Sequence, residues 1–140
     1  MEREYNDPKI PDQELEYPPE PPERLKKPSR KLAQKLLSEV SFEDRFVGYR
    51  MRQRAGSVAV TCYSFEQVVH LLRDQLPMID LTGLERWVRQ VLCDECLADK
   101  IGIARDQGQN NYQRTLLIRE LAEERLRQCK AITTLMKQQA

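Results

Sequence analysis

Seven of the eight prolines in this 140-residue chain lie within its first 28 residues. Proline fixes φ and has no amide hydrogen, so a segment this rich in proline forms neither a helix nor an inner strand. We therefore expect residues 1–28 to form an extended, disordered tail that precedes the packed structure. Pro77 is the only proline after residue 28. The length of the remaining sequence suits a single domain.

The charges are distributed as unevenly as the prolines. The whole chain has a formal net charge of +1, but residues 1–23 carry −6 and residues 24–37 carry +6. A uniformly basic or acidic polyelectrolyte is therefore excluded as a description of the whole chain. Adjoining blocks of opposite charge favour a tail that screens its own basic stretch until an anionic partner displaces it. Two solvated segments without a specific role are the alternative.

Beyond residue 28 the apolar residues repeat with the spacing of helices, and one stretch alternates like a strand. Ser29 and Ser64 are suitable N-caps, and Ser64 to Gln67 has the pattern of a capping box. The sequence predicts helices at 29–40, 64–76 and 82–92 and a strand at 57–63. Residues 42–55 fit a helix and a strand equally well.

The segment from 97 to 118 is predicted as a hairpin. Residues 97–104 contain glycine and β-branched side chains, 106–111 are rich in turn formers, and 112–116 suit a returning strand. From about Leu117 the helical period resumes. A plain all-α helical bundle, in which 95–138 is helical throughout, is the alternative to this prediction.

The predicted order of elements over residues 30–118 resembles the winged helix-turn-helix fold. We therefore expect a mainly α protein with a small β component, made of a disordered tail (1–28), a winged-helix-like domain (29–118) and a C-terminal helix (119–140). The resemblance rests on element order and on the helix pair within 64–91, and it points to the superfamily without naming a family in it.

The resemblance implies contacts with double-stranded DNA. In that superfamily the second helix of the pair enters the major groove and the wing contacts the adjacent backbone. The residues matching the groove-entering helix are Arg86, Arg89 and Gln90, and those matching the wing are Lys100, Arg105 and Arg114. The basic stretch 24–35, with Arg50, Arg52 and Arg54, would add attraction that does not depend on sequence. An ordinary solvated helix face is the competing interpretation of the same arginines.

The four cysteines predict either core thiols or a metal site. Cys93 and Cys96 are spaced as zinc ligands, and Cys62 and Cys129 would complete a four-cysteine site. A second close pair, which would make the motif specific, is missing. We therefore expect no cofactor, with zinc as the alternative.

The composition argues against an enzyme. The chain has one histidine and five glycines, so it contains neither a histidine pair for a metal nor a glycine-rich phosphate loop. No apolar run is long enough to span a bilayer. We expect a cytoplasmic, non-enzymatic DNA-binding regulator of transcription that forms a homodimer through its C-terminal helix. The alternative is a protein–protein adaptor or accessory subunit that uses the tail and the terminal helix.

Overall fold

The computed structural model describes residues 25–74 and 77–139. The protein is mainly helical, with a small antiparallel sheet and a long C-terminal helix, as the sequence predicts. The elements in chain order are α1 (Arg30–Leu36), the 3-10 turn η2 (Phe42–Asp44), β1 (Phe46–Arg52), β2 (Gly56–Cys62), α2 (Phe65–Leu72), β3 (Pro77–Met78), α3 (Leu81–Gln90), α4 (Glu95–Gln107) and α5 (Asn111–Gln139).

Serine side chains cap the N-termini of α1 and α2. The Ser29 hydroxyl accepts the amide of Leu32 at the start of α1, at 3.1 Å. Ser64 accepts the amide of Gln67 at 3.2 Å, and the Gln67 side chain in turn accepts the amide of Tyr63 at 2.6 Å. The predicted capping box at α2 is therefore confirmed, although its return bond reaches the residue before the cap. The helix ends at Leu72, earlier than the predicted 76.

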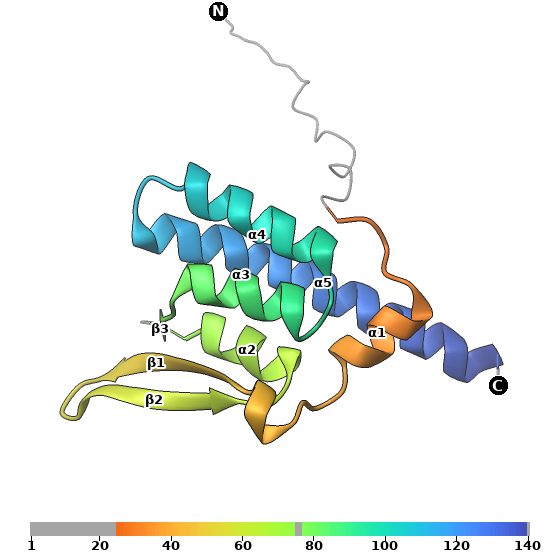
Figure 1. Ribbon diagram of the computed structural model, residues 1–140, viewed down its shortest axis with the longest axis horizontal. Helices are drawn as coiled ribbons and strands as arrows, with labels where there is room; N and C mark the ends of the chain where they lie inside the picture. The colour runs from red at the N-terminus through yellow and green to blue at the C-terminus, as the bar shows by residue number, and fades with distance from the viewer. Residues whose placement is uncertain (1–24, 75–76, 140) are drawn as a thin grey trace, which may run out of the picture.

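The sheet resolves the ambiguity of residues 42–55 in favour of a strand. β1 pairs with β2 along its whole length and with β3 at its middle residues, Tyr49 and Arg50, which gives the order β2-β1-β3. Gly56, with φ of +70°, closes the loop between β1 and β2 in a conformation that favours glycine. The hairpin extends away from the helical body (Figure 1).

The helices pack on one face of the sheet. The inward side chain of Phe46 packs on Trp87 of α3, with ring centroids 5.5 Å apart, and the Trp87 indole donates to the Asp44 carbonyl at 2.6 Å. Gly48 also faces inward. A Cβ at this position would lie 2.5 Å from the Leu71 side chain, so the absence of a side chain at Gly48 lets α2 pack closely against β1. The core therefore extends from the inner face of the sheet into the interior of the helical layer.

The predicted hairpin at 97–118 is wrong: these residues form α4 and the first part of α5. Leu97, Ala98, Ile101 and Ala104 all lie on the buried side of α4, which packs against both α3 and α5. Burial of one apolar face stabilises the helix more than the β propensity of two isoleucines opposes it. Residues 97–118 therefore do not form a wing, and this segment does not support the winged-helix resemblance.

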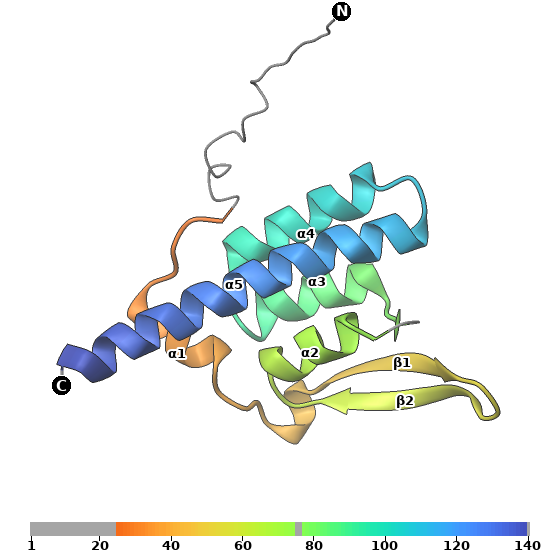
Figure 2. The same cartoon turned by 180° about the vertical axis from the view of Figure 1, so that it is seen from behind.

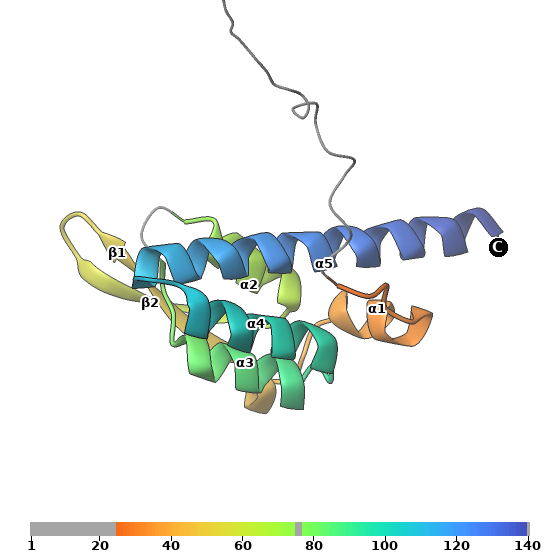
Figure 3. The same ribbon diagram turned by 90° about the horizontal axis from the view of Figure 1, so that it is seen from above.

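The expected domain boundaries also shift. α5 begins at Asn111 and packs on α1, α2 and α4, so it belongs to the same packed unit as residues 29–118 (Figures 2 and 3). Within the expected tail, Leu25 is only 1% exposed and Pro28 is buried. The packed body therefore begins by residue 25. The expectation for residues 1–24 lies outside the described residues.

The segment at Leu25 is held in place by a buried ion pair between Arg125 of α5 and Asp94, the N-cap of α4. Arg125 donates to both carboxylate oxygens of Asp94, at 2.8 and 3.1 Å, and both side chains are 1% exposed. The same guanidinium donates to the Lys26 carbonyl at 2.6 Å. Gln128 donates to the Leu25 carbonyl at 3.1 Å. The segment leading into α1 is therefore fixed to the middle of α5.

Candidate nucleic-acid interface

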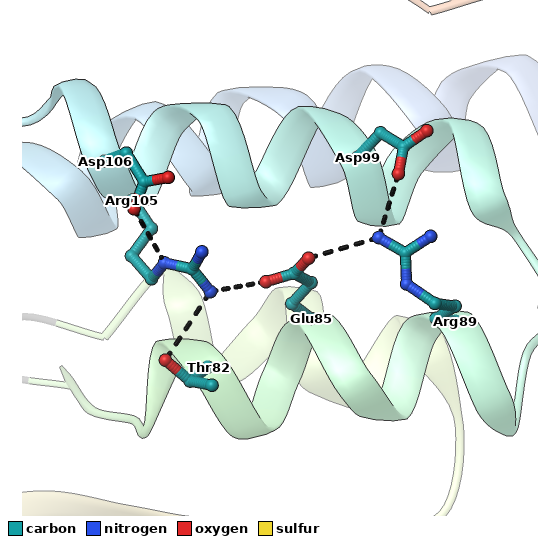
Figure 4. Close-up of polar contacts among 6 residues, drawn as sticks. All are labelled: Thr82, Glu85, Arg89, Asp99, Arg105 and Asp106. Atoms are coloured by element: carbon teal, nitrogen blue, oxygen red, sulfur yellow. Dashed lines mark hydrogen bonds and ion pairs between the residues drawn. The ribbon is translucent and has the colours of Figure 1, made fainter.

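The seam between α3 and α4 contains two of the predicted DNA contacts, Arg89 and Arg105. Glu85 of α3 accepts hydrogen bonds from Arg89, at 3.1 Å, and from Arg105 of α4 (Figure 4). Arg89 also reaches Asp99 at 2.8 Å, and Arg105 reaches Asp106 at 3.2 Å. These contacts join the two helices through a row of alternating charges.

The pairing raises the pKa of both guanidinium groups. Hydrogen bonds to Asp99 and Glu85 raise the pKa of Arg89, and hydrogen bonds to Asp106 and Glu85 raise that of Arg105. Each cation is thus stabilised by carboxylates of its own chain, so it is less free to bind a phosphate. Arg89 and Arg105 act here as structural links between helices.

Gly102 allows the two helices to approach closely. A Cβ at this position would lie 3.0 Å from the Glu85 carboxylate, which two arginines hold in place. Gly102, which favours a strand in the sequence, therefore lies at the close contact between α3 and α4.

The remaining predicted contacts are scattered over three helices. Arg86 and Gln90 are exposed on α3, and Lys100 is half-buried on α4. Arg114 lies on α5, where its Nε donates to the Gly108 carbonyl at 3.0 Å and closes the α4–α5 turn. Of the six predicted contacts, only Arg86 and Gln90 are fully on the surface. The three positions expected on a wing lie instead on α4 and α5.

A different basic surface lies where α1 runs beside the C-terminal half of α5 (Figure 2). No acidic residue occurs in 25–38 or in 125–139. We call this surface the basic end. Its exposed cations include Lys26, Lys27, Lys31, Lys35, Arg127 and Lys137, and Arg30 and Lys130 are exposed there as well.

Buried side chains of α1 and a hydrogen bond from α5 hold the basic end in place. Ala33 and Leu36 are fully buried on the inner face of α1, so its lysines point outward. The bond from Arg125 to the Lys26 carbonyl fixes the chain before α1. Two nearby cations are already neutralised, because Arg125 pairs with Asp94 and Lys130 pairs with Glu66 at 2.9 Å. The sequence contained the signal for this surface, since 24–37 is its most basic block.

The three arginines of the hairpin differ from one another. Arg50 pairs with Asp74 at 3.3 Å. Arg52 and Arg54 are exposed at the tip. The tip and the basic end lie at opposite ends of the molecule (Figures 1 and 2), so they do not combine into one binding surface.

The four cysteines do not come together. Cys62 and Cys129 are buried, Cys96 is half-buried, and Cys93 is exposed. Burial raises the pKa of the Cys62 and Cys129 thiols to about 11, as expected for thiols in an apolar core. Among the residues that the structure describes, no group of three or more His, Cys, Asp or Glu side chains could hold a metal ion. The four-cysteine zinc site is therefore not formed.

A cavity of about 430 Å³ lies between the end of α2, Pro77 and the start of α5. Its charged lining residues include Arg73 and Asp74, which are already paired with Glu123 and Arg50. These two charges are therefore part of the internal pairing of the fold.

No protein-family model, curated protein or solved structure matches this chain. Within residues 25–74 and 77–139, none of the helices combines the length and apolar character needed to cross a membrane.

Proposed function

We propose that the protein binds double-stranded DNA through the phosphate backbone, using the basic end. The observation that carries this proposal is the group of exposed cations, these six among them, on two adjoining segments that contain no acid. Lysine and arginine side chains that neutralise phosphates release counterions, which gives affinity without base recognition. The α3 side chains Arg86 and Gln90 stay a prediction for base contacts.

The fold supports this proposal by presenting the cations on a fixed frame. α1 is capped at Ser29 and packed on α5, so its lysines are held along one helix face rather than on a mobile segment. A rigid row of cations loses less conformational entropy on binding than a disordered one. The contacts go to phosphates, so the proposed binding is only weakly selective for sequence.

The test is fluorescence anisotropy with a labelled duplex of about 20 base pairs, measured from about 50 to about 200 mM salt. If all six cations contact phosphates, the slope of log affinity against log salt is about −5. The triple variant Lys27→Gln, Lys31→Gln, Lys35→Gln should reduce that slope by about three and weaken binding at least about tenfold.

The matched control removes three exposed cations that the proposal does not use: Arg52→Gln, Arg54→Gln, Arg73→Gln. It changes the net charge by the same amount, and we expect it to retain most of the affinity. Equal losses in both triple variants would contradict the proposal, because affinity would then follow net charge and not the basic end. No binding at about 50 mM salt would favour the alternative role as a protein adaptor.

A further inference from the structure

The outer face of the sheet is apolar and bare. Eight large hydrophobic side chains are exposed in the described residues, and four of them lie on this one face. Val47, Tyr49 and Met51 alternate along β1 with exposures of 37, 45 and 48%, and Met78 of β3 is 43% exposed. Such a cluster marks an interaction surface, whereas single exposed hydrophobics need no explanation.

The register places these side chains side by side. Tyr49 lies opposite Ala59 on one side and Met78 on the other. Val47 lies opposite Thr61, and Met51 lies opposite Ser57. Paired residues share a face of the sheet, so the outer face of the paired strands holds no charged side chain. We call these seven residues the bare face.

All the helices lie on the other side of the sheet (Figure 1). The inward residues Phe46 and Cys62 are buried, whereas each outward residue of β1 and β2 is exposed. An antiparallel sheet commonly leaves one face to solvent, and that face is then usually polar rather than apolar. Here, among the described residues, only one layer is present.

The ends of the hairpin carry opposite charges. Arg52 and Arg54 are exposed at the tip. At the base, Glu43 and Asp44 are exposed in η2, and the single cation between η2 and β1, Arg45, is half-buried over the Phe42 ring, so this end is net negative. The bare face lies between a positive end and a negative end, so it is complementary to a copy of itself turned end for end. A parallel arrangement would bring four tip arginines together and is opposed by their repulsion.

We propose that the bare face is covered by a second copy of this chain. The two sheets pack face to face about a two-fold axis perpendicular to the strands, near Tyr49. Each tip then meets the base of the other copy, and the apolar side chains of both faces leave water together. A two-fold interface requires this kind of self-complementary patch. This dimer uses the sheet and not the C-terminal helix.

The test is sedimentation velocity of the full chain from about 1 to about 200 µM. We expect a dimer that forms as concentration rises. Tyr49→Arg places two like charges at the axis and should weaken the dimer about a hundredfold or more, as for a central residue in two copies. Tyr112→Arg makes the same substitution at a 74% exposed tyrosine of α5 and should leave the dimer unchanged.

A charge exchange separates docking from folding. The double variant Arg52→Glu, Arg54→Glu should weaken the dimer, because the tip then meets a base of like charge. Adding Glu43→Arg and Asp44→Arg to the same chain should restore it. A variant that only damages the fold would not be rescued, and circular dichroism of each variant checks the helical content.

Two results would overturn the proposal. One is a chain that stays monomeric over the whole concentration range. The other is a dimer that survives Tyr49→Arg but dissociates with Leu135→Arg, since Leu135 is 55% exposed on the last turns of α5. The second result would assign the dimer to the terminal helix.

Discussion

Replacing Arg125 with methionine should be the most damaging change of a single charge in this protein. The Arg125 side chain is 1% exposed and donates four hydrogen bonds: two to Asp94, one to the Lys26 carbonyl and one to Gln128. Methionine keeps the apolar volume of the stem and removes all four. The Asp94 carboxylate then stays buried, and the amide of Leu97, at 3.1 Å, is its remaining hydrogen-bond donor among the described residues.

The magnitude follows from this geometry. Breaking a buried ion pair by removing one partner costs about 3–5 kcal/mol, because the other charge is left without compensation. We expect the free energy of unfolding to fall by about 4 kcal/mol. For a domain of this size, such a loss lowers the thermal midpoint by roughly 10–15 °C. The segment at Leu25 should also loosen, since its anchor is lost.

The assay is urea denaturation followed by circular dichroism, with Arg127→Met as the matched control. Arg127 is exposed on the same helix, and its replacement should change stability by no more than about 0.5 kcal/mol. Asp94→Asn keeps an acceptor for the Leu97 amide. In the double variant with Arg125→Met, the loss should therefore be about 1–3 kcal/mol smaller than the sum of the single losses. A loss below about 1 kcal/mol for Arg125→Met would refute the reasoning.

Three further outcomes are expected. Gly102→Ala should destabilise the protein by about 1 kcal/mol despite the higher helix propensity of alanine, because the new Cβ meets Glu85 at 3.0 Å; a gain in the urea midpoint would contradict this. The pKa values of Cys62 and Cys129 are raised to about 11 from 9.0, so the folded state binds more protons than the unfolded state between pH 9 and pH 11. Stability should therefore fall as pH rises through this window, and replacing both thiols with alanine should flatten the pH profile. Neutralising the acids of residues 1–23 by Glu→Gln and Asp→Asn should raise DNA affinity at low salt if the tail screens the basic end; unchanged affinity in the anisotropy assay would exclude screening.

The elements that sequence reasoning placed correctly depend on contacts a few residues apart. The Ser29 and Ser64 caps, the strand ending at Cys62 and the apolar stripe containing Trp87 can all be read from spacing alone. Each rests on a hydrogen bond or an alternation within one turn or one strand. The long C-terminal helix was placed for the same reason, although its start at Asn111 was missed.

The errors occurred where distant segments decide the local structure. Residues 97–118 have mixed propensities, and they are helical because α4 buries one face against α3 and α5. The same packing paired Arg105 with Glu85, 20 residues away, and Arg89 with Asp99, 10 residues away. No spacing rule within one helix predicts a pair between two helices. The Glu85–Arg89 pair alone follows the i,i+4 spacing within α3 and could have been found in the sequence.

By itself, the sequence determined the caps, the hairpin strand at 57–62, the apolar stripes and the adjoining blocks of opposite charge. These features follow from local hydrogen bonding and from composition, which do not depend on how the chain is folded. Only the tertiary structure decided that α4 is a helix, that Arg89 and Arg105 are links between helices, and that α1 packs beside α5. It also left the face around Tyr49 uncovered. The physical reason is that burial and ion pairing act between residues far apart in the chain, and they outweigh weak local preferences when the two conflict.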